Sequence, residues 1–128
     1  MHHLKELHVW QKAIELATYV YKVTIDFPVD ERYGLTNQIK RAVVSIASNV
    51  AEGAGRNSDR EFVHFLGIAN GSAYELQTQI IIARNLGLLD ENHTKYIEEQ
   101  LNEIQKMIYG FQKKLKITFK SKEHGQGV

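Results

Sequence analysis

Apolar side chains recur along most of the chain at alternating intervals of three and four residues, the spacing of one face of an α-helix. Four segments follow this pattern, and no segment alternates with the period of a β-strand. The four segments are residues 7–26, 35–53, 59–86 and 94–117. The third holds the longest run, in which apolar or small side chains keep a near-heptad rhythm from Phe62 to Gly87. The pattern therefore predicts an all-α chain of four amphipathic helices.

Turn and capping residues separate these segments. Pro28, the only proline, ends the first helix, because the residue before a proline is disfavoured in the α conformation. Gly53 and Gly55 predict a left-handed stop after the second helix. Ser58 with Glu61 predicts a capping box at the start of the third. Short connections favour an antiparallel up-down-up-down four-helix bundle over residues 1–118, followed by a flexible basic and polar tail over residues 119–128.

The second and third helices carry more apolar and small side chains than one core stripe needs. Two glycines four residues apart in the third helix would each cost about 1 kcal/mol relative to alanine, so close packing of another helix is one reason to keep them. One interpretation is an overfilled core within a single bundle. The other, which we favour, is a subunit interface of a homo-oligomer. The predicted interface residues are Val44, Ala47, Ala51, Gly67, Ile68, Gly71, Ile81 and Ile82.

The composition is that of an ordinary globular domain. The 128 residues are 43% hydrophobic and 24% charged, a length that suits one domain. The absence of cysteine excludes a disulfide framework, a thiolate nucleophile and a cysteine-ligated zinc site. No apolar run approaches the length of a membrane span, and the first residues lack the layout of a signal peptide. We therefore expect a cytoplasmic protein.

Charge is distributed unevenly along the chain. The net charge is only +1, from 16 basic and 15 acidic side chains. Residues 106–122 nevertheless hold six lysines and no acid, whereas residues 1–105 hold 10 basic and 14 acidic side chains. In an oligomer such patches would be multiplied and could bind nucleic-acid phosphates. The candidate phosphate contacts are Lys40, Arg41, Arg56, Arg60, Lys113, Lys114, Lys116 and Lys120. The alternative is that the lysines only stabilise a helix C-terminus.

Catalytic chemistry has little support in the sequence. Glu61-Phe62-Val63-His64 fits the Glu-x-x-His spacing of di-iron bundles once, but Phe62 faces the predicted core and His64 therefore does not. His2, His3 and His8 could chelate a metal, although a disordered start is the simpler expectation. We predict no cofactor, no metal and no enzymatic activity.

Several longer stretches resemble a known family. They include Leu7 to Ala13, Ser45 to Gly53, and Gly71 to Leu76, and the likeness runs in order from about Leu4 to Leu115. In these stretches the chain resembles the bacterial four-helix-bundle proteins encoded in intervening sequences of 23S rRNA genes. The resemblance implies a homopentamer and kinship with the accessory variability protein of diversity-generating retroelements, which binds nucleic acid and works beside a reverse transcriptase. Ala47 stands where the family usually has proline, and Lys40-Arg41 where it usually has two arginines.

These observations predict a non-enzymatic, oligomeric helical bundle that binds RNA or DNA without sequence preference. Its expected partners are other copies of itself, a nucleic acid, and a reverse-transcriptase-like or RNA-processing protein. The alternative is an oligomeric protein–protein interaction scaffold that binds no nucleic acid.

Overall fold

The structure is a computed structural model that describes residues 2–31 and 34–126, with side chains through residue 120. Four α-helices account for most of it: α1 (His8–Val23), α2 (Leu35–Ala54), α3 (Asp59–Asn85) and α4 (Glu91–Gln126). Two short 3₁₀ helices, η1 (Leu4–Glu6) and η2 (Val29–Glu31), precede α1 and α2. The described residues contain no strand, which confirms the predicted all-α class. No helix in this part of the chain is both long and apolar enough to cross a bilayer.

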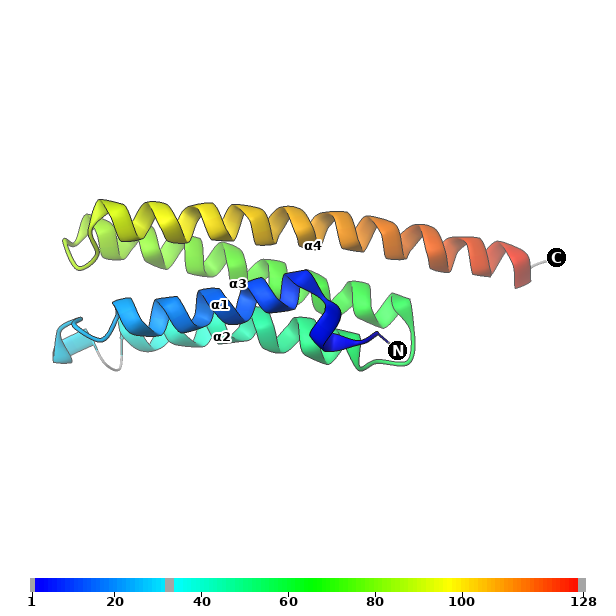
Figure 1. Cartoon of the computed structure of the whole chain (residues 1–128), viewed down its shortest axis with the longest axis horizontal. Coiled ribbons are helices and arrows are strands. Elements are labelled where there is room, and N and C mark those ends of the chain that lie inside the picture. Colours follow the sequence, from blue (N-terminus) through cyan, green and yellow to red (C-terminus); the bar gives the residue numbers. More distant parts are fainter. Residues whose placement is uncertain (1, 32–33, 127–128) are drawn as a thin grey trace.

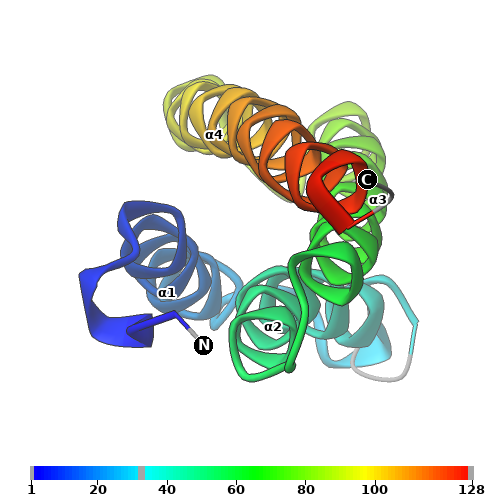
Figure 2. The same cartoon turned by 90° about the vertical axis from the view of Figure 1, so that its right-hand side faces the viewer.

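The helices lie lengthwise beside one another. In Figure 1, α1 and α3 run toward one end of the molecule and α2 and α4 run toward the other. Figure 2, seen along the helices, shows them in the order α1, α2, α3, α4 around the centre. Among helices that are neighbours around the bundle, packing is densest between α2 and α3 and sparsest between α1 and α4. The two middle helices, α2 and α3, therefore pack closely against each other, whereas the first and last helices meet more loosely.

The core follows the predicted stripes in three of the four helices. In α1, however, the stripe was partly wrong. The three-and-four spacing within residues 7–26 includes Ile14 and Tyr21 in the predicted core stripe, but both are more than 40% exposed, and Val9 and Leu16 are buried instead. The α3 and α4 core residues are Phe62, Leu66, Ala69, Ala73, Leu76, Ile80, Ala83, Ile97, Leu101, Ile104, Ile108 and Leu115.

In the connection between α2 and α3, half of the predicted capping box is confirmed and the predicted helix stop is wrong. Ser58 Oγ accepts a hydrogen bond from the Glu61 backbone N–H at 3.2 Å, and the Ser58 hydroxyl donates to the Glu61 carboxylate at 3.1 Å. The predicted left-handed stop at Gly53 and Gly55 is wrong, since Gly55 has φ −84°. Gly53 serves packing instead: a Cβ there would lie 2.7 Å from Phe62 Cδ1.

The left-handed residue lies at the other end, between α3 and α4. Among the described residues, Gly87 alone has a positive φ, 76°. It closes α3 with hydrogen bonds from Gly87 N–H to Arg84 O and from Leu88 N–H to Ala83 O, both at 2.9 Å. Gly87 therefore belongs to the turn and not to the predicted heptad seam.

Helix α4 is longer at both ends than the predicted 94–117. It begins at Glu91 because the Asp90 carboxylate accepts the His93 backbone N–H at 2.7 Å and so caps the first turn. It continues to Gln126, so residues 119–126 of the predicted flexible tail are helical; residues 127–128 lie outside the described part. The last turns of α4 extend past the end of the bundle (Figure 1).

The first residues are packed rather than disordered, contrary to the prediction. The His2 ring lies 4.9 Å from the Phe62 ring and 5.9 Å from the Phe111 ring. Its Nε2 is 3.1 Å from an Asp59 carboxylate oxygen, and its backbone N–H reaches Ala54 O at 3.4 Å. The N-terminal segment thus closes the end of the bundle where α2 meets α3.

Candidate nucleic-acid interface

Two arginines of the candidate set lie at the connection between α2 and α3. The Arg56 guanidinium is 2.6 Å from a Glu52 carboxylate oxygen and lies over the Phe65 ring at 4.7 Å. The Arg60 guanidinium lies over the Phe119 ring, also at 4.7 Å. Because Phe119 belongs to α4, this second contact brings the start of α3 against the lysine-rich end of α4.

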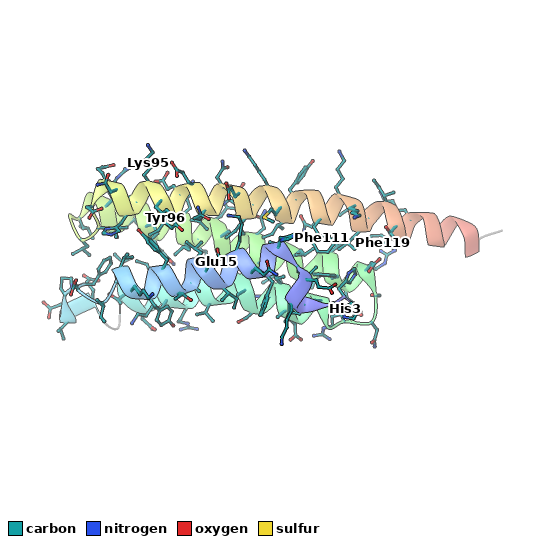
Figure 3. The ribbon with its side chains drawn as sticks, in the orientation of Figure 1. His3, Glu15, Lys95, Tyr96, Phe111 and Phe119 are labelled. Atoms are coloured by element: carbon teal, nitrogen blue, oxygen red, sulfur yellow. The ribbon has the colours of Figure 1, made fainter. Side chains whose placement is uncertain are left out.

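The lysines of α4 divide into two groups around the helix. Lys113, Lys116 and Lys120 are exposed and spaced by three and four residues, which places them on one stripe. Lys114 is exposed as well but lies about 100° around the helix from Lys113, so it belongs to a different side. Phe111 and Phe119 also come from this part of α4 (Figure 3). We call Arg56, Arg60, Lys113, Lys116 and Lys120 the basic end.

The structure does not bring Lys40 and Arg41 to the basic end. They lie in the first half of α2, about 20 Å along the helix axis from its last residue, Ala54, which Arg56 follows. The Lys40 ammonium lies 5.0 Å from the centre of the Tyr21 ring. Arg41 lines a shallow depression between α2 and α3 together with Glu75 and Gln79. The predicted set of eight basic residues is therefore two sets in space.

Two residues that belong with the lysine stripe were not among the predicted contacts. Lys106 lies seven residues before Lys113, and Tyr109 lies four before it, so both fall on the same side of α4. Both are exposed, Tyr109 by 67%. The helical spacing of lysines on either side of a tyrosine was the signal that could have identified them.

The opposite end of the bundle is acidic. Asp26, Asp30, Glu31, Asp90 and Glu91 lie at the connections from α1 to α2 and from α3 to α4. We call these five residues the acidic end.

Titratable groups at the acidic end serve structure. The Asp90 carboxylate caps α4, and its hydrogen bond from the His93 backbone lowers its pKa. Nearby, burial raises the pKa of the Tyr19 hydroxyl, with smaller contributions from Tyr96 and Asp90. A general base works best with a pKa near neutrality, so a lowered carboxyl pKa suits capping better than catalysis. Among the described residues, no three metal-ligating side chains lie together.

The predicted interface residues are mostly, but not all, on the surface of the single chain. Val44, Ile68 and Ile82 are each at least 40% exposed. Gly67 and Gly71 are exposed, and a Cβ added at Gly71 would meet nothing within 4 Å. Ala51 and Ile81 are half-buried. Ala47 is the exception: it is only 6% exposed, because α2 turns it toward the core, so it is removed from the candidate interface.

Comparison with known proteins identifies the family. Residues 5–110 match the family of 23S rRNA-intervening sequence proteins, which covers most of the chain. The chain belongs to this family. The resemblance seen in the sequence is therefore confirmed, whereas kinship with the retroelement accessory protein stays a prediction.

A solved structure supports the fold. A protein of unknown function from the S23 ribosomal protein family of Bacteroides thetaiotaomicron superposes with a TM-score of 0.74 at 23% sequence identity. The similarity covers 82% of this chain and 98% of that one. At this identity the likeness concerns the arrangement of helices alone. No curated protein matches the chain.

Proposed function

We propose that this member of the 23S rRNA-intervening sequence family is a non-enzymatic, cytoplasmic, oligomeric protein that binds nucleic acid through the phosphates. The observation that carries the proposal is the contact of the Arg60 guanidinium with the Phe119 ring. It brings the start of α3 against the lysine-rich end of α4, although these two basic segments are almost 60 residues apart in the sequence. The family's name refers to ribosomal RNA, so RNA is the first nucleic acid to test.

Local charge matters more than the net charge of +1 for this binding. Lys113, Lys116 and Lys120 are exposed and have no acidic side chain between them in the sequence. The acidic end lies at the far end of the helices. Since exposed charges are screened over about 8 to 10 Å at physiological ionic strength, the two ends act nearly independently. A phosphate backbone that binds along these lysines would therefore be little affected by the acidic end.

Two charge-matched double variants test the proposal. Lys116→Gln with Lys120→Gln removes two charges from the basic end. Lys22→Gln with Lys95→Gln removes two exposed lysines at the opposite end, where Lys95 is seen in Figure 3. Binding of a labelled RNA is measured by fluorescence anisotropy as a function of salt. The first variant should lose about 25- to 60-fold in affinity near 0.1 M salt and show a slope of log K against log salt that is shallower by about 1.4 to 1.8.

The control variant should bind like the wild type. Equal losses in the two variants would mean that binding is not localised at the basic end. Absence of binding by the wild type to RNA or DNA at about 50 mM salt would overturn the proposal and favour the protein–protein scaffold.

Assembly of several copies is the second part of the proposal. Its support lies on the outer face of α3, where Ile68 and Ile82 are exposed and a Cβ added at Gly71 would meet no atom of the described residues within 4 Å. In the adjoining depression between α2 and α3, the Gln79 side-chain oxygen is buried without a hydrogen-bond partner. A second copy on this face would cover the isoleucines and could supply a donor to Gln79.

A pair of glycine variants tests assembly. Gly71 and Gly110 are both in helices, and a Cβ at either would meet nothing within 4 Å. Gly71→Leu should lower the molar mass measured by light scattering to that of one chain, because the leucine would obstruct a neighbouring helix. Gly110→Leu should leave the mass unchanged. A wild-type protein that is monomeric at micromolar concentration would contradict this part of the proposal.

A further inference from the structure

The outer stripe of α4 combines positive charge with an exposed aromatic ring. Lys106, Lys113, Lys116 and Lys120 recur at helical spacing, and Tyr109 lies within the same stripe. All four lysines are exposed. The stripe is straight and continuous because α4 runs unbroken from Glu91 to Gln126.

Among the described residues, the Tyr109 side chain takes part in no ring stacking, cation–π contact or hydrogen bond. Its side chain is 67% exposed, whereas its neighbour Ile108 is fully buried. Other aromatic rings at this end have partners: Phe111 packs on Phe62 at 5.0 Å, and Phe119 carries the Arg60 guanidinium. Tyr109 therefore exposes its ring to solvent within the lysine stripe.

We infer that this stripe binds single-stranded nucleic acid, with the backbone along the lysines and a base stacked on Tyr109. The inference rests on the proposed function and specifies its ligand. Lysines alone would attract single strands and duplexes alike, since both carry phosphates. An exposed aromatic ring adds affinity only for a base whose face is free, which a duplex does not offer. Every base has such a face, so the stacking requires no particular sequence.

The competing explanation is that Tyr109 lies in a contact between copies or with another protein. A partner protein would have to be acidic opposite the lysines and apolar opposite the ring. The exposed Ile117, which lies one residue after Lys116, would also suit such a partner. Binding and assembly are therefore measured on the same variants.

The experiment compares Tyr109→Leu with Tyr109→Phe. Leucine removes the ring and phenylalanine keeps it, while neither alters charge. Each variant and the wild type is titrated with a 20-nucleotide single strand of mixed sequence and with the duplex of the same sequence, over a range of salt concentrations. Light scattering and circular dichroism accompany each titration.

Tyr109→Leu should weaken single-strand binding by about five- to 150-fold, with an unchanged salt slope. Duplex binding should change less than twofold, and Tyr109→Phe should behave like the wild type. Equal effects on single strand and duplex, or no effect of leucine while the wild type binds, would overturn the inference and leave the proposed function standing. A loss of oligomer mass in Tyr109→Leu would assign the ring to a protein contact instead. If the wild type bound neither the single strand nor the duplex, both the inference and the proposed function would be overturned.

Discussion

The two ends of the bundle are closed in different ways. At the acidic end, backbone geometry closes the turn from α3 to α4: Gly87 takes a positive φ and Asp90 caps the next helix. At the basic end, side-chain packing closes the structure: the His2, Phe62 and Phe111 rings contact one another, and Gly53 allows α2 and α3 to approach. The turn at the acidic end is closed by local geometry, although the Tyr19 ring of α1 also contacts the Tyr96 ring of α4 there at 4.4 Å. The basic end is closed mainly by contacts between distant segments.

This difference bears on function. A turn held by its own backbone needs few side chains, so its surface can vary without loss of the fold. The basic end depends on residues from the N-terminus, α2, α3 and α4 together, and its arginines lie over the rings of this same region. At the basic end, the residues that stabilise the fold therefore lie within the proposed binding surface. The acidic end lies outside that surface.

The largest expected effect comes from Gly53→Ala at the basic end. The new Cβ would lie 2.7 Å from Phe62 Cδ1 and 2.9 Å from Phe65 Cβ, closer than real Cβ contacts. Such overpacking should lower the free energy of unfolding by about 1 to 3 kcal/mol, measured by urea denaturation. Gly110→Ala is the control and should raise stability by up to about 1 kcal/mol, because nothing obstructs its Cβ. Equal stability changes in the two variants would remove the packing explanation.

A smaller loss is expected from Gly87→Ala at the acidic end. At φ 76° an alanine Cβ is crowded by its own backbone, although no other atom lies within 4 Å. The free energy of unfolding should fall by about 1 to 2 kcal/mol, from backbone strain alone. Nucleic-acid affinity should be unchanged, since the turn is remote from the lysines. A change in affinity as large as that in the lysine double variant would contradict the independence of the two ends.

The smallest effect is a pH dependence at the acidic end. The His93 backbone N–H stabilises the ionised Asp90 and lowers its pKa. A lowered folded-state pKa contributes stability above the ordinary carboxyl pKa of about 3.9, and this is lost as the pH falls through the folded value. Thermal unfolding of wild type and Asp90→Ala should therefore differ at pH 7 and converge below about pH 4. A difference that persists unchanged at low pH would show that the cap does not depend on ionisation.

Residues that act through local geometry were the predictable ones. The Ser58–Glu61 cap was identified from spacing alone, because its partners are three residues apart. The same holds for the core stripes of α3 and α4. Prediction failed where a residue could serve two purposes: Gly53 suited a helix stop equally well, and Ala47 suited either the core or a surface. Only the rotation of α2 against α3 decides between these uses.

The candidate binding surface divides in the same way. The lysine stripe of α4 follows from the sequence, since its members share one helix and helical spacing relates them. The sequence could not show that Arg60 meets Phe119. The place of Lys40 and Arg41 toward the start of α2, away from Arg56, already follows from the predicted helix over residues 35–53. Contacts within a helix follow from the helical period, so residue spacing in the sequence predicts them. Contacts between helices depend on their direction, length and rotation, which packing of the whole bundle sets.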